Sequence, residues 1–183
     1  MANNTAAVFT RHYDSPMGRI LLAADEIGLR GLWFDGQKYF ARDLPEKRTE
    51  QETHAIAEAR RWLDVYFTGK EPDFLPPLHP IGSAFRQAVW TVLLQIPYGH
   101  TTTYGEIARH LAGTAGLSRM SAQAVGGAVG HNEISIIIPC HRVVGTSGSL
   151  TGYAGGIERK VKLLELERAD MTGFFVPKKG PAL

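Results

Sequence analysis

The sequence contains very little cysteine: Cys140 is the only one among 183 residues. A single cysteine cannot form an internal disulfide, and it excludes zinc sites built from several cysteines. We therefore expect no metal site, and no motif in the sequence requires a cofactor. Because a lone thiol is typical of a reducing compartment, the expected location is the cytoplasm.

Long apolar runs and a strong charge of one sign are also absent. No apolar run approaches the ~20 residues that span a bilayer, so we expect no membrane segment. The first residues, "MANNTAAVFTRH", lack the basic and apolar regions of a secretion signal, and no leader is expected. The formal net charge of +2 is too small to indicate nucleic-acid binding by itself.

The first third of the chain has the composition of strands and turns. Residues 7–13, 19–24 and 29–34 favour strands, separated by the turn sequences "DSPMG" and "DEIG". A helix follows, for which Thr49 and Glu52 form a possible capping box. Its apolar residues recur at helical spacing and predict a core-facing side: Ala55, Ile56, Ala59, Trp62, Leu63, Tyr66 and Phe67.

Prolines gather in "EPDFLPPLHPIG", residues 71–82, which has no periodicity. Such a segment is typical of a connection between domains. We therefore divide the chain into an N-terminal domain (1–75), a proline-rich connection (76–82), a second domain (83–170) and a tail (171–183).

The second domain is expected to be mainly helical. Ser83 can cap a first helix, Thr103 and Glu106 fit the capping box of a second, and Ser121 can cap a third over "AQAVGGAVGHN". The last two helices resemble a helix-turn-helix unit, a pattern that is also common in proteins that bind no DNA.

The third of these helices is built from small residues. Gly126 and Gly127 lie in its interior, and each costs ~1 kcal/mol relative to alanine. Ala122 and Ala124 add to the small surface. Either another helix packs very closely there or the backbone of a ligand does. The spacing does not decide between them, although close helix packing is the commoner reason.

Cys140 lies in "IPCHRVVG", after the apolar run "ISIII", which predicts a buried strand ended by Pro139. A lone cysteine is by default a small buried hydrophobe. Here His141 and Arg142 follow it, and both are costly to bury without partners. Because the thiolate is the nucleophile, a histidine that takes the thiol proton, directly or through a water, indicates an activated cysteine.

Such a histidine needs a group that orients it, often a carboxylate. The order of residues does not identify this carboxylate. Four glutamates remain possible, two of them on a final helix predicted over residues 156–169: Glu106, Glu133, Glu165 and Glu167.

Longer stretches carry a resemblance to a known family. "IPCHRVVG" followed by "GSLTGYAGGIERKVKLLELE" resembles the active-site region of the O6-alkylguanine-DNA alkyltransferases, the methylated-DNA–protein-cysteine methyltransferases. "FRQAVWTVLLQIPYGHTTTYGEIA" and "AVGGAVGHN" are similar to the helices that precede it. The likeness is close over residues 84–168 and looser in "DSPMGRILLAADEIGLRGLWF".

The resemblance implies a fold and a reaction. The fold is a ribonuclease-H-like α/β domain, a small antiparallel sheet plus a helix, followed by a mainly α domain with a helix-turn-helix. A monomer would bind double-stranded DNA in the minor groove and flip out an O6-alkylguanine. The alkyl group, or that of an O4-alkylthymine, would pass to the cysteine and leave the protein spent, without metal or cofactor.

The resemblance also implies roles for single residues. Cys140 is the alkyl acceptor, and His141 is the base that acts through a water. Glu167 orients His141, Asn132 fixes the turn around the cysteine, and Tyr104 donates its hydroxyl to the flipped guanine. The implied guanine pocket is lined by Val143, Leu150, Tyr153 and Ala154. The implied DNA contacts are Arg119, Ala122, Gln123, Ala124, Gly126, Gly127 and Gly130.

The sequence departs from the family pattern at the intercalating residue. The family usually has arginine where this chain has Gln123, which is uncharged and shorter. Either Gln123 or Arg119, one helical turn earlier, is expected to fill the gap left by the flipped base. This change keeps a second function open, a lesion binder that repairs nothing, although such relatives carry tryptophan in place of Cys140.

A cysteine hydrolase is disfavoured because adjacent Cys and His rarely face each other. Lys160 is expected to pair with a carboxylate inside the protein.

Overall fold

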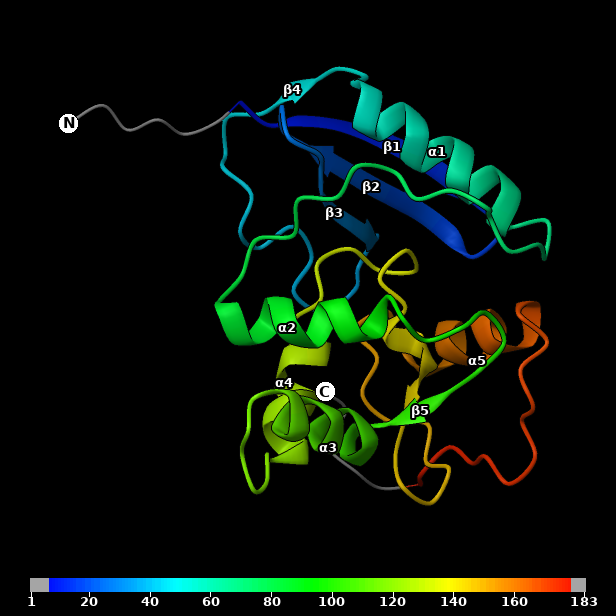
Figure 1. The fold of residues 1–183 in the computed structure, drawn as a ribbon. Coiled ribbons are helices and arrows are strands. Elements are labelled where there is room, and N and C mark those ends of the chain that lie inside the picture. The colour runs from blue at the N-terminus through cyan, green and yellow to red at the C-terminus, as the bar shows by residue number, and fades with distance from the viewer. Residues whose placement is uncertain (1–6, 179–183) are drawn as a thin grey trace. The chain divides into compact units, whose positions relative to one another are not determined.

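The computed structural model describes residues 7–178 of the chain (Figure 1). Its contacts separate two compact units, Met1–Ile81 and Gly82–Leu183. Residues 1–6 of the predicted N-terminal domain and residues 179–183 of the predicted tail lie outside the described residues. Within residues 7–178, no helix combines the length and the apolar character needed to cross a membrane.

The first unit contains a four-stranded sheet in the order β3-β2-β1-β4. Its strands are β1 (Phe9–Ser15), β2 (Gly18–Ala24), β3 (Leu29–Phe34) and β4 (Thr49–Glu50). β1, β2 and β3 are antiparallel, whereas β4 pairs with β1 in parallel. The three strands predicted from composition are present, and β1 ends two residues later than expected.

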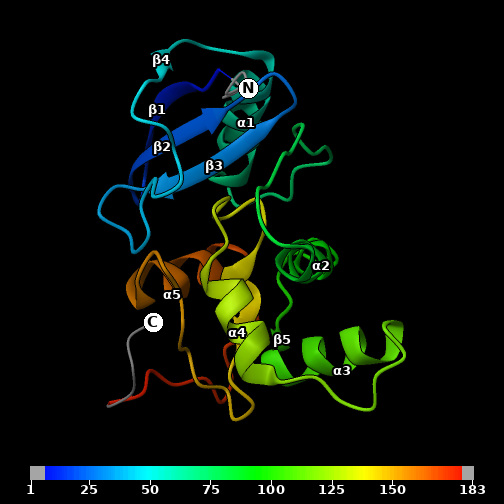
Figure 2. The same ribbon diagram turned by 90° about the vertical axis from the view of Figure 1, so that its left-hand side faces the viewer.

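One helix, α1 (His54–Tyr66), packs against the three long strands of this sheet (Figure 2). Its N-cap is Thr53, whose side chain accepts a hydrogen bond from the Ile56 N–H at 3.3 Å. The capping box predicted at Thr49 and Glu52 is therefore wrong. Thr49 lies in β4, because its backbone pairs with β1 and is not available to start the helix.

The second unit is built around α2 (Ala84–Leu93), α3 (Tyr104–Thr114) and α4 (Ala122–Gly130). The three predicted caps are confirmed: Ser83, the Thr103–Glu106 capping box and Ser121 each bond the first turn of their helix. Trp90 on α2 donates its indole N–H to the Ala128 carbonyl on α4 at 2.9 Å, which ties the two helices together.

A short parallel pair joins two distant parts of this unit. β5 (Thr102–Thr103) leads directly into α3, and β6 (Val143–Val144) directly follows the 3₁₀-helix η1 (Cys140–Arg142). Because Thr102 pairs with Val143 and Thr103 with Val144, the start of α3 lies beside the end of η1. The last helix, α5 (Ile157–Leu166), is shorter than the predicted 156–169, and Glu167 forms its C-cap.

The apolar run "ISIII" is buried, as predicted, but it is not a strand. Its backbone turns: Ile137 N–H bonds the Ser135 carbonyl at 2.8 Å and Ile138 N–H bonds the Ile134 carbonyl at 3.1 Å. Ile136 has a φ of +68°, a left-handed conformation that β-branched residues rarely adopt. Strand propensity is overridden because the side chain of Asn132 binds the carbonyls that a neighbouring strand would otherwise bind.

Candidate active site

Cys140 begins η1 and is buried, with 4% of its surface exposed. The Asn132 side-chain amide donates to its Sγ at 3.1 Å and to the Ile138 carbonyl at 2.8 Å. The Asn132 carbonyl oxygen accepts from the Ile134 N–H at 3.0 Å. One side chain thus bonds both ends of the turn and the sulfur. A left-handed Ile136 persists only where surrounding contacts hold it, as these do.

Burial raises the pKa of the Cys140 thiol, while the hydrogen bond from Asn132 and the charge of Lys160 act in the opposite direction. The net shift is upward, so the resting side chain is a neutral thiol. A neutral thiol is a poor nucleophile. A base must therefore remove its proton before it can attack.

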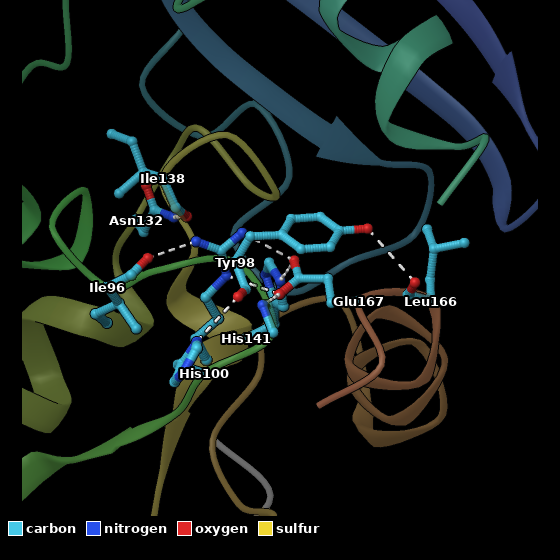
Figure 3. A network of polar contacts seen from close by, with 10 residues as sticks. Ile96, Tyr98, His100, Asn132, Ile138, His141, Leu166 and Glu167 are labelled. Atoms are coloured by element: carbon cyan, nitrogen blue, oxygen red, sulfur yellow. Dashed lines mark hydrogen bonds and ion pairs between the residues drawn. The ribbon is translucent and has the colours of Figure 1, made fainter. Parts of the chain in front are cut away.

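His141, the next residue, is bound to Glu167. The distance from His141 Nε2 to Glu167 Oε1 is 2.7 Å, and both side chains are fully buried (Figure 3). Since a carboxylate only accepts hydrogen bonds, Nε2 carries the hydrogen and Nδ1 is the ring nitrogen that can take a proton. Burial lowers the pKa of His141, although Glu167 acts to raise it, and the net result is a neutral imidazole suited to act as a base.

Arg142 and Gly99 also bind Glu167. The Arg142 guanidinium donates from Nε to Oε2 at 2.8 Å and from Nη2 to Oε1 at 3.0 Å. The Gly99 N–H donates to Oε2 at 3.2 Å. Burial alone would raise the pKa of Glu167, but the bonds from His141 and Arg142 outweigh it and lower the pKa well below its usual range. The carboxylate therefore stays ionised beside His141.

The sequence did not point to Arg142 and Gly99 as parts of this arrangement. Arg142 also donates from Nη1 to the Ile96 carbonyl at 2.6 Å, so its planar group bridges two segments. Gly99 has a φ of +73°, and a Cβ there would lie 2.8 Å from the Glu167 carbonyl oxygen. The glycine of "IPYGH" was the available signal, because a turn that closely approaches another backbone requires glycine.

Tyr104, the first residue of α3, donates its hydroxyl to the Thr151 carbonyl at 3.3 Å. Burial, and then the charge of Cys140, raise its pKa to about 12. The same carbonyl accepts from Lys160 Nζ at 2.7 Å, and Lys160 also donates to the Val143 carbonyl at 2.6 Å. The prediction that Lys160 pairs with a carboxylate is wrong: its acceptors among residues 7–178 are the backbone carbonyls of Thr151 and Val143.

The residues predicted to line a guanine pocket have different surroundings. Val143 and Tyr153 are buried, and the Tyr153 ring lies edge-on to His141 with centroids 6.3 Å apart. Ala154 is partly buried. Leu150 is buried in an apolar cluster with Val144 and Leu164.

The residues predicted to contact DNA lie on α4 and in the loop before it. Arg119, Ala122, Gln123, Ala124 and Gly127 are exposed, and Gly126 and Gly130 are partly exposed. A Cβ on Gly127 or Gly130 would meet no atom of the described residues within 4 Å, and one on Gly126 would make ordinary contact with the Tyr104 ring at 3.8 Å. Close internal packing therefore does not explain these glycines.

Sequence families give a consistent picture across both units. Residues 84–169 match the family described as 6-O-methylguanine DNA methyltransferase, DNA binding domain. Residues 8–80 match the ribonuclease-like domain of the same family. Together the two matches cover most of the chain.

Curated relatives are similar over nearly their whole length. The methylated-DNA–protein-cysteine methyltransferase of Methanosarcina acetivorans is 44% identical over 156 residues, which are 85% of this chain and 95% of the relative. The protein of the same name from Mycobacterium tuberculosis is 45% identical over 168 residues, 90% of this chain and 97% of the relative.

Solved structures agree. The crystal structure of Mycobacterium tuberculosis O6-methylguanine methyltransferase has a TM-score of 0.74 and 45% identity, covering 88% of this chain and 93% of that one. A structure of the Mycobacterium tuberculosis protein in complex with DNA has a TM-score of 0.73 and 43% identity, covering 87% and 92%.

Proposed function

Because the chain belongs to the 6-O-methylguanine DNA methyltransferase family, we propose that it repairs DNA by moving the alkyl group of O6-alkylguanine onto Cys140, once per molecule. The observation that carries this proposal is the buried Cys140 thiol next to a histidine whose other nitrogen is bound to an ionised Glu167. This is the arrangement that an activated cysteine requires.

The first step is removal of the thiol proton. His141 takes it at Nδ1 through a bridging water, and the imidazolium is stabilised by Glu167 at Nε2. Arg142 keeps Glu167 ionised, so the proton stays on the histidine. The amide of Asn132 and the ammonium of Lys160 favour the resulting thiolate.

The thiolate then attacks the alkyl carbon. A sulfur–carbon bond forms as the carbon–O6 bond breaks, and the electron pair of that bond goes to the guanine. Tyr104 donates its hydroxyl to the minor-groove edge of the base and stabilises its negative charge. The guanine anion takes a proton from water, and His141 returns the thiol proton to water, so the step balances; the thioether on Cys140 ends the reaction.

DNA contact is assigned to α3 and α4 as a helix-turn-helix. The exposed small residues of α4 support this assignment, because a groove wall can approach a helix surface that has almost no side chains. The connection between the two helices, residues 115–121, is longer than the usual turn of three or four residues. We assign α4 to the minor groove on the family resemblance.

Gln123 is the residue we assign to the gap left by the flipped base. It is exposed in the first turn of α4 beside the small residues, whereas Arg119 lies in the preceding loop. Glutamine can hydrogen-bond the unpaired base but brings no charge. We expect weaker DNA binding than an arginine would give.

Repair is favoured over lesion binding without repair, because Cys140 and its base are both in place. The thiol must stay reduced to act, which supports a cytoplasmic location. The domain limits proposed from the sequence, 1–75 and 83–170, place every one of these groups in the second domain.

The test counts methyl groups. A duplex with labelled O6-methylguanine is added in excess, and transferred label is compared with the amount of protein. We expect one methyl per protein molecule and then no further reaction, with none on a Cys140→Ser variant. Continued turnover would contradict a single-use acceptor, and tight binding without transfer would identify a lesion binder.

A further inference from the structure

The Thr151 carbonyl accepts hydrogen bonds from the buried Lys160 and from the partly buried Tyr104. Lys160 Nζ lies 2.7 Å from it and the Tyr104 hydroxyl lies 3.3 Å from it. Lys160 is fully buried, and it also donates to the Val143 carbonyl, three residues after Cys140. A carbonyl oxygen has two lone pairs, so both donors can bind at once, and the lysine makes the shorter bond.

This arrangement matters for the proposed reaction. The Tyr104 hydroxyl has a single hydrogen. To donate it to the guanine, Tyr104 must release the Thr151 carbonyl. If Tyr104 were its only donor, this partly buried carbonyl would be left without a hydrogen bond, and that cost would be added to the barrier of the transfer step.

We propose that Lys160 is a positioning residue that allows Tyr104 to exchange the Thr151 carbonyl for the guanine. Lys160 keeps Thr151 bonded when the tyrosine hydroxyl turns to the substrate. The inference rests on the proposed function, because it needs Tyr104 to act on a leaving guanine. It assigns Lys160 a role that acts through Tyr104 and requires no contact with the base.

The charge of Lys160 suits this role at the moment it is needed. Burial lowers the pKa of Lys160 to about 8, and the negative charge of Cys140 acts to raise it. When Cys140 becomes a thiolate, the ammonium form with its three donors is favoured. Two of these donors are already bonded to Val143 and Thr151.

A double-mutant cycle tests the proposal. The single-turnover rate of methyl transfer at saturating O6-methylguanine duplex is measured for the wild type, Lys160→Met, Tyr104→Phe and the double variant. Without the lysine, Tyr104 is the only side chain within residues 7–178 that bonds the Thr151 carbonyl, so Lys160→Met should slow transfer about tenfold, or ~1.4 kcal/mol. In the Tyr104→Phe background the same change should cost clearly less than tenfold, because only the effect of the ammonium on the thiolate is then lost. DNA affinity should not change.

The matched control is Lys162→Met, which removes an exposed lysine from the same helix and should leave the rate unchanged. An equal loss from Lys160→Met in both tyrosine backgrounds would overturn the proposal in favour of a general effect on the thiolate or the fold. If thermal unfolding shows that Lys160→Met is not folded, Lys160→Gln takes its place under the same criterion. Failure of both to fold would also overturn it. A wild type that transfers no methyl would refute the proposed function instead.

Discussion

At the scale of single residues, Glu167 holds the proposed catalytic residues together. It binds His141, Arg142 and the Gly99 N–H through its two carboxylate oxygens. The pKa of Glu167 is lower in the folded protein than in the unfolded chain, so these bonds stabilise the fold. The full effect requires a pH at which Glu167 is also ionised in the unfolded chain. The stabilisation is fully present above the ordinary glutamate pKa of ~4.3 and is lost as the pH falls below it.

Glu167→Gln should therefore destabilise the protein by about 3 kcal/mol at neutral pH, because it leaves the buried Arg142 charge without its partner. The difference from the wild type should shrink as the pH falls below about 4. Urea unfolding at several pH values measures both effects. Glu165→Gln, an exposed position on the same helix, is the control and should change little. A difference that does not vary with pH would contradict the account of Glu167.

Asn132→Asp replaces the amide that donates to Cys140 Sγ with an acceptor. The thiolate would lose a hydrogen bond and gain a like charge nearby, which disfavours it. We expect methyl transfer to slow at least tenfold, about 1.4 kcal/mol. A stopped single-turnover assay measures the rate, and circular dichroism checks the fold. An unchanged rate in a folded variant would show that Asn132 does not act on the sulfur.

Much of this arrangement could be predicted from the sequence. Which glutamate binds His141 and which groups bind Lys160 could not. The proposed nucleophile and its proposed base follow from "PCHR" alone. Four glutamates remained possible for the orienting carboxylate, because residues far apart in sequence meet only through the fold. Lys160 was assigned the wrong partner for the same reason: a buried ammonium needs acceptors, and carbonyls satisfy it as well as a carboxylate does.

At the scale of elements, helix starts were predicted well because capping is local. The side chains of Ser83, Thr103 and Ser121 each bond a backbone N–H three residues on. The prediction at Thr49 failed because this residue pairs with β1, which is distant in sequence. "ISIII" failed likewise: its composition predicted burial correctly, but Asn132 dictated a turn.

The small residues of α4 lead to a prediction in which one substitution raises stability and lowers DNA affinity. Gly127→Leu should stabilise the protein by up to ~1 kcal/mol, because leucine favours helix more than glycine does and meets no neighbour. It should weaken DNA binding at least tenfold by holding the groove away. Gly113→Leu, at an exposed and equally open position of α3, is the control for binding. Equal DNA affinities of the two variants would show that this part of α4 does not contact DNA.

Gln123→Arg should restore the charge and reach that the family usually has at this position. We expect DNA affinity to rise severalfold and its dependence on salt to steepen, because one more phosphate-attracting charge is present. Titrations at several salt concentrations measure this. Gln95→Arg adds the same charge at an exposed position after α2 and serves as the control. If affinity and repair rate are unchanged, Gln123 does not occupy the gap.

At the scale of the whole molecule, the second unit contains all the groups proposed for the chemistry. β5 and β6 bring Tyr104 beside the residues that follow Cys140, and Glu167 caps the C-terminus of α5. The tail predicted from residue 171 onward contributes as well: the Leu150 N–H bonds the Phe175 carbonyl at 2.9 Å, and Phe174 packs on the cluster around Leu150. Pairings of this kind join segments that sequence patterns treat separately.

The central claim is that Cys140 accepts the alkyl group and that the protein is then spent. Incubation with an O6-methylguanine duplex, followed by intact mass measurement and peptide mapping, tests it most directly. The account predicts one added methyl group, located on the peptide at Cys140, and restored guanine in the DNA. An unmodified Cys140 after the guanine has been repaired, or a methyl group on another residue, would contradict it.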